Sequence, residues 1–271
     1  MSYVLREAEI PVLPAGHRPI RILHFSDLHL TPRRKTEIAD IKSWINYSPD
    51  LVISTGDFLA DMQAVPVVLD ALDGLLDTPG LFVFGSNDYF APKPKNPLKY
   101  LLPDRGKRVH GDDLPWPELD QGLQNRGWIN LNRSRTTITI NDTVIEARGT
   151  DDAHLEFDDY SLVAGEAGKC DLAIGVTHAP YLRIIEAMAE DNLDVIFAGH
   201  THGGQVRLPW PGGSKALTTN CDLPNWRARG LTHVKGEPFL HVSAGMGTSP
   251  FARIRFASPP EVSLVTLTSL L

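Results

Sequence analysis

The chain has 271 residues, 42% of them hydrophobic, and a formal net charge of -7 at pH 7. This length and apolar content suit one α/β domain with a large core, and the acidic balance excludes a global basic field that attracts nucleic acid. Two cysteines, Cys170 and Cys221, are too few for a disulfide framework. Neither a signal-peptide pattern nor an apolar run long enough to span a membrane is found, so we expect a soluble, cytoplasmic protein.

Short apolar runs, each stopped by small or polar residues, are typical of buried strands. They span residues 20–26, 51–55, 81–84, 171–177 and 195–198. A helical spacing of apolar residues lies between them, at 36–47, 62–77 and 180–191, where Pro66 and Pro180 suit first turns. Strands that alternate with helices predict a largely parallel sheet, whose sites lie at the carboxyl ends of the strands.

Three further segments depart from this alternation. Residues 91–117 are rich in proline and basic side chains and predict an irregular insertion. Residues 128–147 alternate apolar and polar side chains, which predicts a hairpin, and residues 261–271 alternate in the same way and predict a last strand. Without a repeat or a clear linker, we expect one domain over 1–271 with an insertion at about 91–117.

Polar clusters end these predicted strands. They are Asp27-x-His29, Gly56-Asp57, Gly85-Ser86-Asn87-Asp88, His178 and Gly199-His200-Thr201-His202. Such a mixture of oxygen and nitrogen ligands suits Mn, Fe, Zn, Ni or Co better than Mg or Ca alone. A carboxylate can also bridge two cations about 3.5–4 Å apart, which is the spacing of hydrolytic two-metal sites.

This ordered series resembles the calcineurin-like metallophosphoesterase superfamily, over residues 20 to 268. The segment 243–267, SAGMGTSPFARIRFASPPEVSLVTL, is similar to a branch of membrane-associated bacterial phosphodiesterases that includes enzymes cleaving a UDP-diacylglucosamine pyrophosphate. The resemblance implies an α/β fold, a four-layer αββα sandwich of two mixed sheets flanked by helices. It also implies two divalent transition-metal ions as cofactors. We expect Mn first, with Fe, Zn, Ni or Co as alternatives.

The resemblance also implies a role for each matching residue. Asp27, His29 and His202 would hold the first metal, His178 and His200 the second, and Asp57 would bridge both. The expected activity is hydrolysis of a phosphodiester or pyrophosphate bond by direct attack of a metal-activated hydroxide. The expected substrate is a phosphorylated small molecule or a lipid-linked compound.

One motif departs from the family pattern G-N-H-D. In an ungapped alignment, Ser86 takes the position of the asparagine ligand and Asn87 that of the histidine at the phosphate. We expect Asn87 to shift and become the ligand, because an amide oxygen binds a hard cation better than a neutral hydroxyl. The alternative is a second site completed by Ser86 or water. His154 and His241 are candidates to replace the absent histidine, unless the leaving group needs no acid.

Other interpretations stay open beside this one. The altered motif also fits a metal-binding or phosphate-binding module of the same fold that lost efficient catalysis. Asp88, Asp151 and Asp152 could orient ligands or substrate or could close turns, and His24 is expected to be packed. The basic segment 91–117 could contact anionic lipid, which would place a cytoplasmic protein at the membrane periphery. We expect neither a nucleic-acid partner nor an obligate protein partner.

Overall fold

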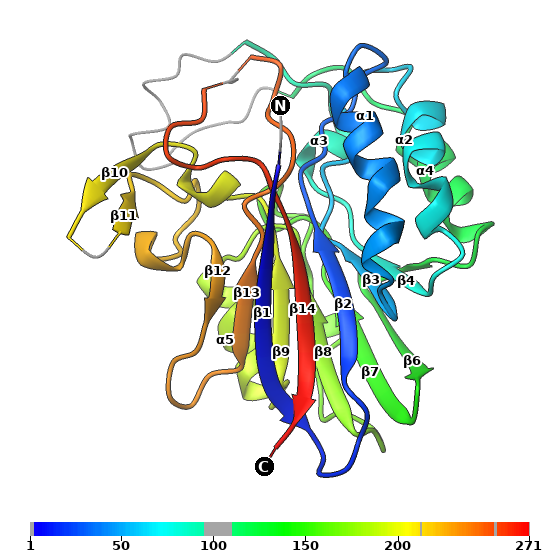
Figure 1. The fold of residues 1–271 in the computed structure, drawn as a ribbon, viewed down its shortest axis with the longest axis vertical. Coiled ribbons are helices and arrows are strands. Elements are labelled where there is room, and N and C mark those ends of the chain that lie inside the picture. The colour runs from blue at the N-terminus through cyan, green and yellow to red at the C-terminus, as the bar shows by residue number, and fades with distance from the viewer. Residues whose placement is uncertain (1–2, 95–109, 212, 252–253, 271) are drawn as a thin grey trace.

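Two six-stranded sheets face each other at the centre of the molecule (Figure 1). The computed structural model describes residues 3–94, 110–211, 213–251 and 254–270. Within these ranges, no helix is long and apolar enough to cross a membrane.

The first sheet is mixed. In spatial order its strands are β1 (Val4–Leu13), β14 (Glu261–Ser269), β2 (Ile20–Phe25), β3 (Leu51–Ser54), β4 (Gly80–Phe82) and β5 (Ile129–Asn130). All neighbours pair in parallel except β14 and β2, which are antiparallel. The carboxyl ends of β2, β3 and β4 therefore meet at one edge of the sheet.

The second sheet is mixed as well. Its strands are β12 (Gly230–Thr232), β13 (Phe239–Val242), β9 (Val195–Ala198), β8 (Leu172–Val176), β7 (Thr143–Gly149) and β6 (Ser134–Ile140). The outermost pair at each edge is antiparallel and the inner pairs are parallel. The expected hairpin within 128–147 is confirmed as β6 and β7.

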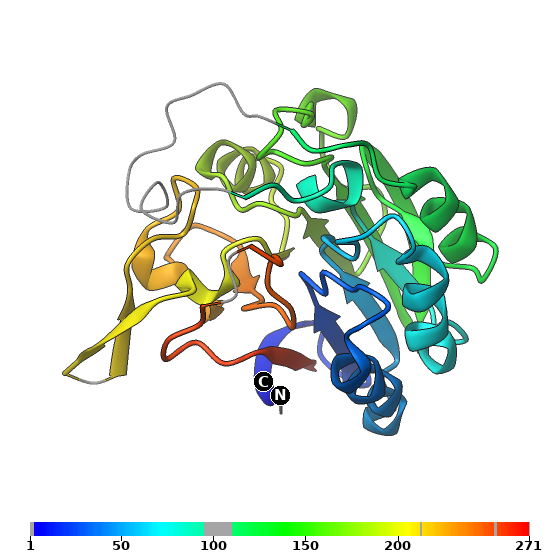
Figure 2. The same cartoon turned by 90° about the horizontal axis from the view of Figure 1, so that it is seen from above.

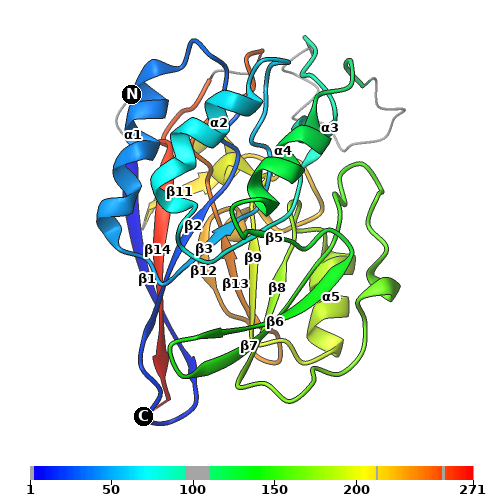
Figure 3. The ribbon, with the colours of Figure 1, turned by 90° about the vertical axis from the view of Figure 1, so that its right-hand side faces the viewer.

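Helices cover the outer face of each sheet, which gives four layers (Figures 2 and 3). Figure 3 places α1 (Lys35–Lys42), α2 (Val65–Leu72) and α4 (Trp116–Gln124) on the first sheet, and α5 (Leu182–Glu190) on the second. Each of these four helices buries apolar side chains in a core shared with its sheet, and the two inner faces share a third core. The expected four-layer αββα sandwich is confirmed.

The observed elements differ from the sequence-based prediction in length and number. The helix expected at 36–47 is α1 followed by a 3-10 turn, and it stops where Ser48 takes a left-handed conformation with φ 46°. Pro66 lies in the first turn of α2, as expected, whereas Pro180 precedes α5. α4 begins at Trp116, inside the segment that we expected to be irregular, of which residues 95–109 lie outside the described ranges. The sequence did not predict β1.

Candidate metal centre

The polar clusters converge from both sheets onto one end of the molecule. Asp27 follows β2, Asp57 follows β3, and Asn87 lies in the short helix α3 (Ser86–Tyr89) after β4. His178 follows β8, and His200 follows β9. Parallel neighbours end at the same edge of a sheet, so each sheet brings its own cluster to this end.

The backbone at this end is unusual, because five non-glycine residues have φ between 44° and 67°. They are Asp27, His29, Asp57, His200 and His202. A residue with a Cβ rarely adopts this left-handed region, which costs of the order of 1–2 kcal/mol. Strain of this kind persists where the surroundings hold the backbone, and it gathers at functional sites. All five belong to the ligand set that the sequence predicts.

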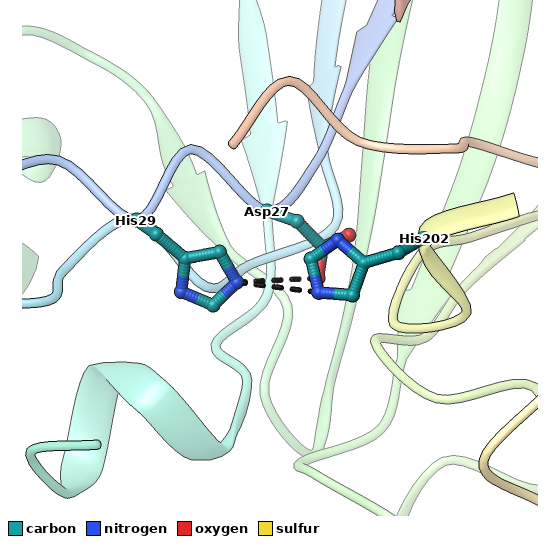
Figure 4. A group of neighbouring side chains, drawn as sticks. All are labelled: Asp27, His29 and His202. Carbon is teal, nitrogen blue, oxygen red and sulfur yellow. Dashed lines mark hydrogen bonds and ion pairs between the residues drawn. The ribbon is translucent and has the colours of Figure 1, made fainter. Parts of the chain in front are cut away.

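The first group of side chains is Asp27, His29 and His202 (Figure 4). The Nε2 atoms of His29 and His202 are 3.4 Å apart. Asp27 Oδ1 lies 3.9 Å from His29 Nε2 and 3.5 Å from His202 Nε2. Three donor atoms thus face a common point, as a tridentate cation site requires.

Burial lowers the pKa of both imidazoles in this group. The pKa of His29 falls well below its usual value, and that of His202 falls to about 4. Burial alone would raise the pKa of Asp27, but His202, His178 and His29 outweigh it and hold that pKa below the usual value. Near pH 7 this group therefore offers neutral imidazoles and an ionised carboxylate, the protonation states that bind metals.

Asp57 lies between this group and a second one, formed by Asp27, Asp57 and His178. Asp57 Oδ2 is 3.6 Å from His29 Nε2, and its Oδ1 is 3.6 Å from His178 Nε2. The Nδ1 of His178 donates a hydrogen bond to the Thr55 carbonyl at 2.6 Å. This bond fixes the tautomer, so that Nε2 faces the carboxylates.

The second group holds protons more tightly than the first. Burial would lower the pKa of His178, but Asp57, Asp152 and Asp27 outweigh it and raise the pKa to about 9. Burial raises the pKa of Asp57, against the opposing effect of His178. Near pH 7 His178 therefore carries a proton that a bound cation would displace.

Asn87 contacts the Asp57 carboxylate directly, whereas no hydrogen bond from the Ser86 side chain to that carboxylate is found among the described residues. The backbone N–H of Asn87 donates to Asp57 Oδ1 at 2.8 Å, and its side-chain Nδ2 donates to Oδ2 at 2.7 Å. A Cβ on Gly85 would collide with Asp57 Oδ1 and with the His178 ring. The glycine thus lets the α3 turn approach close enough for Asn87 to reach the site.

Asp88 is a buried structural anchor. Its two oxygens accept four backbone N–H bonds, from Asp57 at 2.7 Å, Phe58 at 2.7 Å, Leu59 at 3.2 Å and Gly85 at 2.9 Å. Burial and the neighbouring Asp57 raise its pKa to about 7. Asp88 therefore ties the loop after β3 to the turn after β4 and orients the residues that carry the second group.

His200 is buried beside His178, with ring centroids 5.2 Å apart. Its Nε2 lies 3.1 Å from the Asn220 carbonyl, which leaves Nδ1 as the second nitrogen. Burial lowers its pKa to about 3. The His154 ring packs against it at an angle of 46° with centroids 4.5 Å apart, and His154 Nδ1 lies 3.1 Å from the Tyr181 hydroxyl. The structure thus brings His154 to the His200 side of the site.

Asp152 is a buried residue whose position the sequence left open. Its Oδ1 accepts from the His154 backbone N–H at 3.0 Å, and its Oδ2 is buried without a hydrogen-bond partner among the described residues. Burial raises its pKa to about 7, although His178 opposes that change. Asp151 instead binds the Tyr89 hydroxyl at 2.7 Å and Arg133 at 2.8 Å, a structural role.

Two histidines outside the predicted ligand set pack between the sheets. His241 Nδ1 is 2.8 Å from His24 Nδ1, and both rings are buried. The idea that His241 replaces the absent phosphate-contacting histidine is wrong, because its ring faces His24 inside the protein. The expectation that His24 is packed is confirmed.

Arg255 contacts the first group through His202 and through the backbone next to it. Its guanidinium donates to the carbonyls of Gly245 at 3.0 Å and Gly247 at 2.6 Å and lies 3.2 Å from His202 Nδ1. An arginine cannot accept a hydrogen bond, and the Gly247 carbonyl is also a hydrogen-bond partner of His202. We assign the His202 proton to Nδ1, directed at this carbonyl, which leaves Nε2 available.

The donor atoms fit a metal centre. Among the described residues, three buried side-chain atoms of the two groups have no hydrogen-bond partner: Asp27 Oδ1, His29 Nδ1 and His178 Nε2. Buried polar atoms are almost always satisfied, so unpartnered ones need an explanation. Two of them, Asp27 Oδ1 and His178 Nε2, face other ligand atoms. A cation coordinated by them would supply the missing interaction.

The sequence matches known proteins along most of its length. Residues 20–204 match the calcineurin-like phosphoesterase family. The chain is 28% identical to YpbG of Bacillus subtilis, over 93% of this chain and 82% of that protein. It is 28% identical to the UDP-2,3-diacylglucosamine pyrophosphatase LpxG of Chlamydia trachomatis, over 91% and 83%, and 25% identical to the phosphodiesterase YaeI of Escherichia coli, over 92% and 82%.

These matches confirm the resemblance that the ordered series of strand-end motifs indicated, and with it the expectation of a metal-dependent phosphohydrolase. The matched segment contains every member of the two ligand groups, from Asp27 to His202. The chain belongs to the calcineurin-like phosphoesterase family.

Proposed function

We propose that this protein hydrolyses a phosphodiester or pyrophosphate bond at a centre of two divalent cations. The observation that carries the proposal is the position of Asp57. One carboxylate oxygen lies 3.6 Å from a nitrogen of His29 and the other lies 3.6 Å from a nitrogen of His178. A carboxylate placed between two ligand groups in this way can bridge two cations.

In this proposal each cation has its own ligands. Asp27, His29 and His202 would hold the first. His178, His200 through Nδ1, and the Asn87 amide oxygen would hold the second. The Asn87 amide needs only to rotate to present its oxygen, because its backbone N–H already fixes it on Asp57. When bound, the cations lower the pKa of a water molecule and neutralise the negative charge that develops in the transition state.

The other residues position these ligands and move protons. The Thr55 carbonyl and Asp88 hold the second group in place. His154 is our candidate for protonating the leaving group, because its ring packs against His200 and lies within hydrogen-bond distance of the Tyr181 hydroxyl. Asn87 and Asp57 complete the catalytic set.

The names of two relatives support a phosphodiester or pyrophosphate bond as the bond that is hydrolysed. One is a pyrophosphatase of a lipid-linked sugar nucleotide and the other a phosphodiesterase. We infer a phosphorylated small molecule or a lipid-linked compound as substrate, in the cytoplasm or at the membrane periphery, with Mn²⁺ as the first metal to test. We infer neither a nucleic-acid substrate nor an obligate protein partner.

The test is elemental analysis of the freshly purified protein, paired with hydrolysis of bis(p-nitrophenyl) phosphate before and after chelation. We expect close to two metals per chain and activity that chelation removes and Mn²⁺ restores. One metal or none, with no turnover after reconstitution with Mn²⁺, Fe²⁺, Zn²⁺, Ni²⁺ or Co²⁺, would contradict the proposal. That result would favour the non-catalytic binding module.

A further inference from the structure

An arginine beside the metal centre lacks a partner for its charge. Arg229 follows the turn Asn225–Arg227 and directly precedes β12. Its side chain is partly buried, and its Nη1 atom is buried without a hydrogen-bond partner among the described residues. Neither a hydrogen bond nor an ion pair of this guanidinium is found in the part of the chain that the structure describes. Buried donors are almost always paired, so this arginine needs an explanation.

The segment of Arg229 is fixed to the turn that carries two ligand histidines. The hydroxyl of Thr201, which lies between these histidines, donates to the Ala228 carbonyl at 2.6 Å. Gly203 follows the ligand His202 directly, and a Cβ built on Gly203 would lie 3.3 Å from Arg229 Cδ. The side chain of Arg229 therefore packs over the backbone next to the first ligand group.

A second arginine reaches the same glycine. Arg207 begins β10 (Arg207–Trp210), and its Nη1 donates to the Gly203 carbonyl at 2.8 Å. Its Nε and Nη2 donate to the hydroxyl and the carbonyl of Ser214 at 2.9 Å and 2.6 Å. All of these acceptors are neutral. Arg207 thus brings a buried positive charge to Gly203, and the hydrogen bonds found for it in the described chain include no carboxylate.

A buried carboxylate near these cations is already paired. Arg6 lies on β1, an edge strand that contacts β12, the edge strand of the other sheet (Figure 1). Its Nε donates to the buried Glu261 at 2.8 Å. Burial and Arg229 lower the pKa of Arg207, and Glu261 opposes that change. Burial also lowers the pKa of Arg229, where Glu261 opposes the change and Arg6 adds to it. Three guanidinium groups and one carboxylate leave an excess of positive charge.

We propose that Arg229, with Arg207 beside it, binds an oxyanion group, a phosphate or a carboxylate, next to the metal centre. A guanidinium presents its N–H donors in a planar fork that matches the oxygens of such groups. The side chain of Arg229 is only partly buried, so an anion from solvent can reach it. A bound anion would pair the guanidinium and balance the excess charge, whereas a neutral ligand would leave that charge unbalanced.

The oxyanion has two possible sources, a second anionic group of the substrate or a free anion such as inorganic phosphate. The position of Arg229 favours the substrate, because Arg229 packs over the residue that follows the ligand His202. One molecule could then place one phosphate at the metals and another at Arg229, as a diphosphate does. This choice of source rests on the proposed function. The binding of an oxyanion does not, because it is measured without metal and without turnover.

The test is thermal unfolding of the full chain after chelation, in sodium chloride and in sodium phosphate of equal ionic strength at neutral pH. Chelation removes any cation that would itself bind phosphate. We expect phosphate to raise the unfolding temperature of the original chain by about 2 °C or more. Arg229→Gln should lose most of this increase, and the remainder measures the general effect of phosphate on the protein surface.

Arg18→Gln is the matched control, since it removes the same charge from an arginine whose side chain is 67% exposed. It should keep the full response to phosphate. In chloride, Arg229→Gln should unfold at the same or a higher temperature than the original chain, because it removes an unpaired and partly buried charge. A lower unfolding temperature of Arg229→Gln in chloride would overturn the proposal in favour of a structural role for Arg229.

Inhibition of bis(p-nitrophenyl) phosphate hydrolysis by ADP and by AMP distinguishes the two sources, because ADP has one more phosphate. If the substrate supplies the oxyanion, Arg229→Gln should weaken inhibition by ADP about tenfold and leave inhibition by AMP unchanged. If a free anion supplies it, neither inhibition changes and the response of unfolding to phosphate still depends on Arg229.

Two further results would overturn the proposal: no increase of the unfolding temperature in phosphate, or an equal increase in the original chain and in Arg229→Gln. Failure of the proposed function has a different signature. In that case no variant turns over bis(p-nitrophenyl) phosphate, while the response of unfolding to phosphate still shows whether Arg229 binds an oxyanion.

Discussion

The two halves of the candidate metal centre differ in how they hold protons. In the half built on His29 and His202, imidazoles outnumber carboxylates and burial keeps both rings neutral. In the half built on His178, three carboxylates surround one ring and raise its pKa to about 9. The same residue type is therefore ready for a cation in one half and protonated in the other. The local balance of charges, and not the ligand type, therefore sets how pH affects the protonation of the histidines in each half.

The largest expected effect comes from Asp57, which joins the halves. Asp57→Asn removes the negative charge between them, so we expect hydrolysis to fall about a thousandfold and the metal content to drop from two towards one per chain. Hydrolysis of bis(p-nitrophenyl) phosphate measures the loss of activity, and elemental analysis measures the loss of metal. Asp61→Asn is the control, because Asp61 lies in the same loop and its side chain accepts a hydrogen bond from the Gln63 backbone N–H, away from the ligand groups. Retention of both metals and of activity in Asp57→Asn would show that the halves are independent.

Asp88 tests whether the second half depends on a structural anchor that the first half lacks. Asp88→Ala leaves four backbone N–H groups without their acceptor. We expect the free energy of unfolding to fall by about 3 kcal/mol, because the donors stay buried and unsatisfied. Urea denaturation measures the change, with Asp61→Ala as control. A loss below about 1 kcal/mol would mean that water replaces the carboxylate.

Substitutions of Asn87 and Ser86 show which of the two residues is a ligand in the second half. We expect Asn87→Ala to weaken the second metal by about 10–100-fold, because the residue also orients Asp57. Ser86→Ala, one residue away, should change the affinity less than about twofold. Calorimetric titration with Mn²⁺ measures both variants. The reverse order of effects would assign the ligand to Ser86.

The two halves should also differ in how their metal affinity depends on pH. A cation in the second half must displace the proton of His178, so its affinity should rise about tenfold per pH unit from pH 6 to 8, below the pKa of about 9. The first half should change little over this range, since the pKa of His202 is about 4 and Asp27 is ionised. Metal titrations at pH 6, 7 and 8 test this. An equal dependence of metal affinity on pH at the two sites would contradict the expected difference between the halves.

The sequence predicted most of the fold because its strand signals are local. Short apolar runs precede Asp27, Asp57, His178 and His200, and in each case a strand ends two or three residues before the named residue. The missed elements carry weaker local signals. β1 contains Glu7, Glu9 and Pro11 and becomes a strand through its parallel pairing with β14, which lies more than 240 residues later in the chain.

The candidate site was predictable in its residue types but not in its supporting contacts. The motifs named the donors, and the structure brings five of them together in two groups, Asp27, His29 and His202, and Asp27, Asp57 and His178. His200 packs beside His178, and Asn87 donates to Asp57. The Thr55 carbonyl that holds His178 is 123 residues away in the sequence, and Asn220, which contacts His200, has no motif. His241 was one of two candidates to replace the absent histidine, and its ring is packed against His24.

The sequence alone determined that carboxylates and imidazoles follow the strands, because strand ends and motif spacing are properties of neighbouring residues. Only the tertiary structure decided which nitrogen of His178 faces the carboxylates, how strongly each group holds its protons, and which arginine beside the site has no hydrogen-bond partner within the described chain. These features depend on burial and on distances between segments of two different sheets, and such distances arise only when the sheets pack.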